Sequence, residues 1–312
     1  MEGAKRSPRA KKAEAEKEVL MNPYILLLTG VFLCALALVY FHLETKRFVV
    51  KKYTIASGNL PEAFHNVKLA LIADLHNTVY GKDNKKLLDA IEREKPDYIL
   101  LAGDILVGKV GADFTPAVEF LKKIADRYPV YYSYGNHECR LKEYKKKYKD
   151  MSKRYEQAIA KLPLHMLHNQ HMTITRGGAS IHIYGLEIAH DYYKRFKSYK
   201  MTGNYLTKML GKKKAEYTIL IAHNPYYFPA YAEWGAELVV SGHNHGGIAR
   251  IPFLGGLVDP NLRLFPKYDK GLFKEMESQM VLSGGIGSHS PNFRAFNLPE
   301  LVMITLTGKE AF

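Results

Sequence analysis

Five short apolar stretches are each followed by side chains that bind metal ions or transfer protons. A single such residue at a strand end usually has only a structural hydrogen-bonding role. Five in sequence instead indicate one shared site. The residues are Asp74 and His76 after Val67–Ala73, Asp104 after Asp97–Ala102, Asn136, His137 and Glu138 after Val130–Ser133, His223 after Thr218–Ala222, and His243 with His245 after Leu238–Val240.

The elements that must position these side chains are strands alternating with helices. Lys85–Glu94 and Pro116–Asp126 have helical patterns and separate the first three apolar stretches. Such alternation predicts an α/β layered domain, in which side chains at the carboxyl ends of the strands share one crevice. Gly103, Gly135 and Gly242 precede candidate residues and permit the sharp turns that would aim them.

Composition agrees with a globular domain that has an anionic partner. Of 312 residues, 47% are apolar and 24% are charged, which excludes wholesale disorder, collagen-like repeats and a polytopic membrane protein. Two cysteines exclude a disulfide scaffold. Forty-five Lys and Arg against 31 Asp and Glu give a net charge of +14, which suits phosphate esters, nucleic acid or an acidic membrane surface.

An uncharged segment runs from Val19 to Leu43. About 20 apolar residues suffice for a helix to cross a bilayer, so we predict a transmembrane anchor over residues 21–43. A buried core helix would carry a polar face, which this segment lacks. A cleaved signal peptide is the closer alternative, since Ala35-Leu36-Ala37 resembles a cleavage site, but apolar residues continue to Phe41.

Basic residues flank this segment unevenly. Six lie in the polar tail, residues 1–20, and four lie soon after the segment, at Lys46, Arg47, Lys51 and Lys52. The positive-inside rule therefore favours a cytoplasmic N-terminus, with a catalytic domain outside the cell membrane. We predict a linker and lead-in strand over residues 44–65 and the catalytic domain over 66–312, with a basic insertion at 191–216.

The motifs resemble the signature of the calcineurin-like metallophosphoesterases over about residues 66–308. The flanking stretches HNPYYFP, GHNHGGIARIPFLGG and SGGIGSHSPNFRAFNLPEL are similar to the membrane-associated YkuE/YaeI-like branch. Other members of that group resemble the UDP-diacylglucosamine pyrophosphatases of lipid A synthesis. The resemblance implies a four-layer α-β-β-α sandwich of two mixed sheets, here preceded by one transmembrane helix.

The resemblance also implies two divalent metal ions, with Mn, Fe, Zn and Mg all compatible with the ligand types. The first ion is expected to take Asp74, His76, Asp104 and His245, and the second Asp104, Asn136, His223 and His243. Asp104 would bridge both ions. His137 is expected to be a catalytic residue that is not a ligand, and Glu138 only caps or orients.

The function implied is hydrolysis of phosphodiester or pyrophosphate bonds by a metal-bridging hydroxide, on a lipid-linked or cell-envelope substrate. A metal-dependent phosphomonoesterase and a non-catalytic, membrane-tethered polyanion-binding protein are the alternatives. The Asp-Arg-Gly of the protein serine/threonine phosphatases is missing after Gly103-Asp104, which leaves open which carboxylate, if any, supports His137. Glu187 stands where the YkuE/YaeI-like branch is expected to have Asp, and it is assigned no role.

Two segments are basic and aromatic, Arg140–Tyr155 and residues 191–216. Either they are solvated surfaces, or they bind anionic lipid or a phosphorylated substrate. Binding to nucleic acid is disfavoured, because no recognised DNA or RNA module accompanies them.

Overall fold

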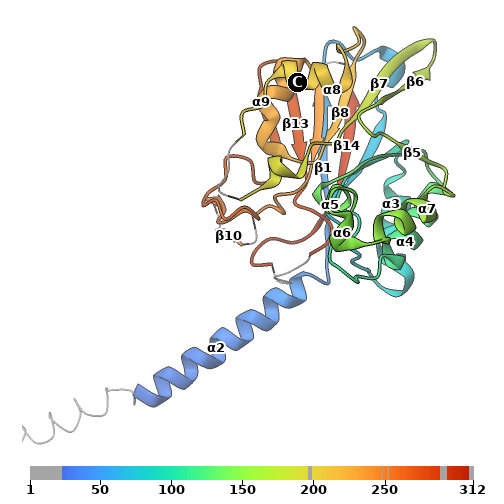
Figure 1. Ribbon diagram of the computed structural model, residues 1–312. Coiled ribbons are helices and arrows are strands. Elements are labelled where there is room, and N and C mark those ends of the chain that lie inside the picture. The colour runs from blue at the N-terminus through green and yellow to red at the C-terminus, as the bar shows by residue number, and fades with distance from the viewer. Residues whose placement is uncertain (1–22, 196–198, 248, 252, 289–293, 309–312) are drawn as a thin grey trace, which may run out of the picture.

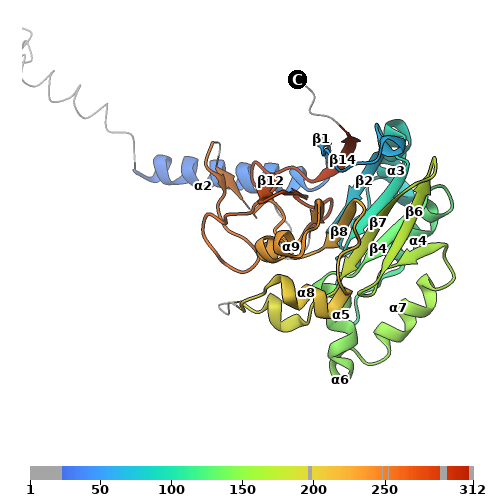
Figure 2. The same ribbon diagram turned by 90° about the horizontal axis from the view of Figure 1, so that it is seen from above.

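Two β-sheets packed face to face form the domain, and one long helix projects from it (Figures 1 and 2). The structure, a computed structural model, describes residues 23–195, 199–247, 249–251, 253–288 and 294–308. The predicted polar tail, the first two residues of the predicted anchor and the last four residues of the domain lie outside this range. The projecting helix is α2 (Pro23–Glu44), which is long and apolar enough to cross a membrane.

The first sheet has the strand order β1-β14-β2-β3-β4-β5. Strand β14 runs antiparallel to β2, and the other neighbours are parallel, so the sheet is mixed. Strand β1 comes from the predicted linker and lead-in segment and forms an edge of this sheet. The strands are β1 (Val49–Ala56), β2 (Lys68–Ile72), β3 (Tyr98–Ala102), β4 (Val130–Ser133), β5 (Leu164–Met166) and β14 (Glu300–Thr307).

The second sheet has the order β12-β13-β9-β8-β7-β6 and is also mixed, since its two outer pairs are antiparallel. Its strands are β6 (His171–Arg176), β7 (Ala179–Leu186), β8 (Thr218–Ala222), β9 (Leu238–Ser241), β12 (Gly271–Glu275) and β13 (Ser278–Leu282). A separate antiparallel hairpin consists of β10 (Arg250–Ile251) and β11 (Gly255–Gly256).

Helices cover the outer face of each sheet. They are α3 (Lys85–Glu94), α4 (Thr115–Ala125), α5 (Asn136–Glu143), α6 (Lys145–Tyr148), α7 (Met151–Ile159), α8 (Gly203–Leu210) and α9 (Phe228–Trp234). Four short 3-10 turns are η1 (Glu62–Phe64), η2 (Lys82–Asn84), η3 (His190–Tyr193) and η4 (Pro225–Tyr227).

Alternating side chains of the strands build three apolar layers. In β2, Leu69 and Leu71 face the other sheet, while Ala70 and Ile72 face the layer formed with α3, α4 and α7. In β8, Ile219 and Ile221 face the first sheet, and Leu220 packs with α8 and α9. The order helix, sheet, sheet, helix confirms the predicted four-layer α/β fold.

The candidate residues follow β2, β3 and β4 in one sheet and β8 and β9 in the other. These strands are parallel to their neighbours within each set, so their carboxyl ends lie at one edge. The two sheets pack against each other through β3, β4, β7 and β8. The fold therefore brings the five loops together where the sheet edges meet.

Candidate metal centre

The loops that carry the candidate ligands have an unusual backbone. Asp74, His76, Asp104, His243 and His245 all have positive φ angles, between 48° and 75°. This left-handed conformation is uncommon for residues other than glycine and is tolerated where the surrounding structure holds it in place. Each turn directs a side chain back across the strand end and into the site.

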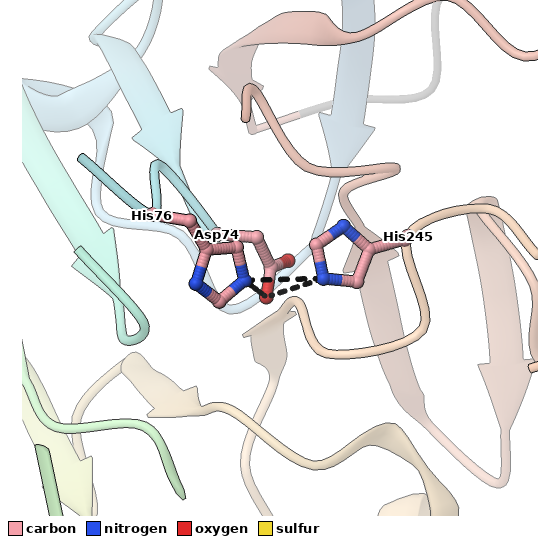
Figure 3. A group of neighbouring side chains, drawn as sticks. All are labelled: Asp74, His76 and His245. Atoms are coloured by element: carbon pink, nitrogen blue, oxygen red, sulfur yellow. Dashed lines mark hydrogen bonds and ion pairs between the residues drawn. The ribbon is translucent and has the colours of Figure 1, made fainter. Parts of the chain in front are cut away.

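The first cluster consists of Asp74, His76 and His245 (Figure 3). The Nε2 atoms of His76 and His245 lie 3.2 Å apart. Oδ1 of Asp74 lies 3.8 Å from His76 Nε2 and 3.6 Å from His245 Nε2. The carboxylate and the two ring nitrogens point toward one another, which is the arrangement of donors around a cation.

The second cluster consists of Asp104, His223 and His243, with Asn136 beside it. His223 Nε2 lies 3.2 Å from Oδ2 of Asp104 and 3.1 Å from Oδ1 of Asn136. The same Oδ2 atom of Asp104 lies 3.9 Å from Nε2 of His76 in the first cluster. The Asp104 carboxylate thus lies between the clusters, where a bridging ligand would lie.

The electrostatics of the buried site favour cations. Burial raises the pKa of Asp74 to about 7, because an isolated carboxylate is poorly solvated there. Burial alone would lower the pKa of His223, but the Asp104 carboxylate raises it to about 9. A bound cation would offset the cost of burying the Asp74 carboxylate, and imidazole nitrogens with carboxylate and amide oxygens fit divalent ions.

The orientation of His223 is fixed from behind. Its Nδ1 atom donates a hydrogen bond to the carbonyl oxygen of Ala102, at 2.6 Å. The proton on Nδ1 leaves Nε2 facing Asp104 and Asn136, and the Nε2 proton of the charged ring is the one that a metal ion would replace. Strand β3 thus supplies both a candidate ligand, at Asp104, and the group that selects the tautomer of another.

His137 lies at the start of α5 and has a different hydrogen-bonding pattern. Its Nδ1 atom accepts a hydrogen bond from the backbone N–H of Gly108, at 2.7 Å. In the neutral ring the proton is then on Nε2, which lies 3.8 Å from Oδ2 of Asp104. A protonated Nε2 can donate to a substrate oxygen but cannot bind a metal ion. This backbone N–H supports His137, whereas the sequence left open which carboxylate, if any, does so.

Glu138 is fully buried and organises the loop that carries Asp104. Its carboxylate oxygens accept hydrogen bonds from the backbone N–H groups of Asp104, Ile105 and Gly135 at 2.8–2.9 Å. The hydroxyl of Tyr132 donates a further bond, at 3.0 Å. This agrees with a capping and orienting role and not with contact to a substrate.

Arg294 is a residue that sequence reasoning missed. Its buried guanidinium lies 3.2 Å from Nδ1 of His245 and donates to the carbonyl oxygens of Gly284 and Gly287. It therefore packs behind the His245 ring and places positive charge near Asp74. The only sequence signal for it is its position in the stretch SGGIGSHSPNFRAFNLPEL.

A pocket of about 740 Å³ opens over the two clusters, and Asp104, His137 and His243 form part of its wall. Within the described residues, Nε of Arg140 and Nδ1 of His190 are buried in this wall without a hydrogen-bond partner. The N–H of the charged Arg140 guanidinium suits an anionic ligand. The basic side chains that line the pocket are Lys109, Arg140, Lys147, Lys194 and Arg195.

Glu187 lies away from these clusters. Its Oε1 atom pairs with Nδ1 of His168 at 2.5 Å, and its Oε2 atom lies 3.8 Å from Nζ of Lys142. These partners give it a local structural role.

Comparison with known proteins shows that the sequence is similar to phosphoesterases. Residues 67–247 match the family described as Calcineurin-like phosphoesterase. An uncharacterized metallophosphoesterase of Aquifex aeolicus is 26% identical over 282 residues, 89% of this chain and 99% of its own length. The uncharacterized metallophosphoesterase YkuE of Bacillus subtilis is 24% identical, over 85% of this chain and 87% of its length.

Two further similarities come from other bacteria. The phosphodiesterase YaeI of Escherichia coli is 24% identical over 77% of this chain and 82% of its own. Among solved structures, TT1561 of Thermus thermophilus has a TM-score of 0.42 and 14% identity, with 70% of this chain and 89% of that chain covered.

Proposed function

This chain belongs to the calcineurin-like phosphoesterase family, and from that membership we propose that it hydrolyses phosphodiester or pyrophosphate bonds of a lipid-linked or cell-envelope substrate, in the manner of the UDP-diacylglucosamine pyrophosphatases. Membership makes the chain a metal-dependent phosphoester hydrolase, which conflicts with the alternative of a non-catalytic polyanion-binding protein. The observation that carries the proposal is the Asp104 carboxylate between two clusters of metal-binding side chains.

The proposed ligands of one ion are Asp74, His76, Asp104 and His245, and those of the other are Asp104, Asn136, His223 and His243. When bound, two divalent ions supply Lewis acidity toward the phosphoryl oxygens and a nucleophilic water at neutral pH. The proposal does not depend on which metal is present.

The protein's own groups complete the chemistry. His137, with its proton on Nε2, donates that proton to the leaving oxygen and stabilises negative charge on the phosphoryl group. The N–H of Gly108 keeps the ring in this tautomer. Arg140 and the lysines of the pocket wall bind further negative charge on the substrate, as a pyrophosphate or a charged diester would carry.

A membrane location is part of the proposal. Helix α2 has 22 residues, and its most apolar stretch of 18 residues is not buried against the domain. Exposure of such a helix to water is unfavourable, so a bilayer is the proposed environment. We retain the division into a tail (1–20), an anchor (21–43), a lead-in segment (44–65) and a catalytic domain (66–312) that lies outside the cell membrane.

A substrate panel tests the proposed reaction. The purified full chain, loaded with Mn²⁺, would be assayed with an aryl phosphodiester, the matching aryl phosphomonoester and glycolipid pyrophosphates. We expect the diester to be hydrolysed faster than the monoester, and a glycolipid pyrophosphate faster still. A faster monoester would make the chain a phosphomonoesterase. Glycolipid pyrophosphates that are not hydrolysed, beside an active diester, would refute only the lipid-linked substrate.

A further inference from the structure

Large apolar side chains are exposed at one place on the domain surface. Within the described part of the domain, eight large apolar side chains are more than half exposed. Six of them lie on the β10–β11 hairpin, at Phe296 beside it, and on the loop that bonds back to the hairpin through the N–H of Phe265 and the carbonyl oxygen of Leu257. Phe253 is fully exposed, and Leu254 and Leu264 are 68% and 69% exposed. We call the six the apolar rim: Phe253, Leu254, Leu262, Leu264, Phe265 and Phe296.

The apolar rim is continuous with the base of α2. The ring of Phe296 contacts the ring of Phe41 in α2, with centroids 5.3 Å apart. Phe296 also lines a shallow hollow of about 370 Å³ together with Phe253 and Leu254 of the β10–β11 hairpin. Figures 1 and 2 show the hairpin on the side of the domain from which α2 leaves.

Backbone contacts attach this region to the helix. The N–H of Arg294 donates to the carbonyl oxygen of Phe41, and the N–H of Asn297 donates to the Glu44 carboxylate, both at 3.4 Å. The rim is therefore held near the end of the helix, at the level where α2 would leave a bilayer.

We propose that the apolar rim inserts into the surface of the same bilayer that holds α2. This inference rests on the proposed anchor. The argument is continuity: the apolar surface of α2 needs lipid around it, and the rim extends that surface sideways onto the domain. Exposed aromatic and aliphatic side chains partition readily into the boundary between headgroups and acyl chains.

The consequence concerns access to the active site. Pro260 and Asn261, in the loop between the rim residues, line the catalytic pocket. Nε of Arg195, which also lines the pocket, donates to the carbonyl oxygen of Pro260 at 3.0 Å. Insertion of the rim thus places one wall of the pocket at the membrane surface, where the phosphate of a lipid headgroup can enter while its acyl chains remain in the bilayer.

The test uses tryptophan fluorescence of the full chain in phosphatidylcholine vesicles, with and without lipids brominated either near the headgroup end of the acyl chains, for the rim, or near their methyl end, for the middle of the anchor. Three variants are compared. Phe253→Trp reports on the rim, and Leu33→Trp reports on the anchor. Met276→Trp is the exposed control, because Met276 lies in a hollow with Ser57 and Gly308, at the end of β1 farthest from α2. The signal of the buried Trp234 is subtracted, using the unsubstituted chain.

We expect brominated lipid to quench the Phe253→Trp and Leu33→Trp signals and to leave Met276→Trp unchanged. Quenching of Leu33→Trp without quenching of Phe253→Trp would overturn the rim proposal and leave the anchor intact. Absence of quenching at Leu33→Trp would overturn the anchor itself. A Phe253→Trp emission that shifts to the blue with protein concentration, without quenching, would show that a second copy covers the rim and would also overturn the proposal.

Discussion

Asp104 is the residue on which the proposed metal centre depends most. Its Oδ2 atom lies within 4 Å of Nε2 of His76 in the first cluster, of His223 in the second cluster and of His137. Its backbone is held in the left-handed conformation, with φ of 55°, by the Glu138 carboxylate. A change at this position therefore affects both proposed ions at once.

We expect Asp104→Asn to lose metal and activity together, because an uncharged amide cannot bridge two cations. Metal affinity and rate should both fall by more than the roughly 10–100-fold that follows when a group hydrogen-bonded to a metal ligand is removed. Elemental analysis of the purified protein, beside the rate with an aryl diester, measures both. Asp89→Asn, at an exposed carboxylate paired with Lys85, is the matched control and should change neither. An Asp104→Asn protein with two ions and a normal rate would refute the two-metal centre.

His137 should separate metal binding from catalysis. Because its Nδ1 accepts from Gly108, we expect His137→Ala to retain both ions and to lower turnover by about 10²–10⁴-fold, the usual scale of general acid–base help. The loss should be smallest with leaving groups that need no proton, such as nitrophenolate. Rates across a series of leaving groups, with metal content measured in parallel, provide the test. Loss of a metal ion would show instead that His137 is a ligand.

At the residue scale, the sequence indicated which side chains meet but not what orients them. Asp74, His76 and Asp104 follow apolar strands, and that local pattern is visible without a structure. Two of the orienting contacts join residues that are far apart in the chain. The N–H of Gly108 contacts His137, 29 positions away, and the guanidinium of Arg294 contacts His245, 49 positions away. Such contacts arise from tertiary packing, which leaves no periodic pattern in the sequence.

At the scale of elements, α5 and the loop after β3 form one unit. Glu138, in the first turn of α5, accepts the backbone N–H groups of Asp104 and Ile105. Burial, together with the nearby Asp104 carboxylate, raises the pKa of Glu138 to about 7. The helix start thus fixes the loop through a buried carboxyl group and not through the metal ions alone.

We expect Glu138→Gln to lower the free energy of unfolding by about 1–3 kcal/mol near pH 6, and by less at pH 8.5, because the raised pKa makes ionisation of the buried native carboxyl group unfavourable for the folded state. The amide replaces one acceptor oxygen, so buried N–H groups of the loop lose their partner. Thermal unfolding of the metal-free protein measures the change. Glu187→Gln, which removes a charge outside the two clusters, is the matched control and should cost less. Equal effects of the two substitutions would refute the organising role of Glu138.

The elements with strong local patterns were predicted closely. The predicted helix Lys85–Glu94 and the strands Val130–Ser133 and Thr218–Ala222 have the same bounds in the structure. The pairing of β1 with β14 was not predictable, because it joins segments about 250 residues apart in parallel register. The β10–β11 hairpin has two residues in each strand, too few for an alternating pattern.

At the scale of the whole molecule, two forces of different kind would hold the domain at a membrane. An apolar helix stays in lipid at any ionic strength. Attraction between Lys or Arg and anionic headgroups is worth about 1 kcal/mol per residue and is screened within about 8 Å at physiological ionic strength. We therefore expect the full chain to remain with membranes in concentrated salt and to be released only by detergent, as sedimentation would show. Release by salt alone would refute the anchor.

A variant that begins at Phe48 separates the remaining contributions, since it lacks α2. We expect it to be soluble, folded and active on small diesters, and to bind anionic vesicles more tightly at low salt than at high salt. Replacing Lys145 and Lys146 in α6 with Gln should weaken the low-salt binding and leave the rate with a soluble diester unchanged, because both side chains are exposed and lie outside the pocket wall. Lys147 lines the pocket and is left intact. Binding that persists in high salt would come from the apolar rim, whereas no binding at any salt concentration would mean that the Arg140–Tyr155 segment is only a solvated surface.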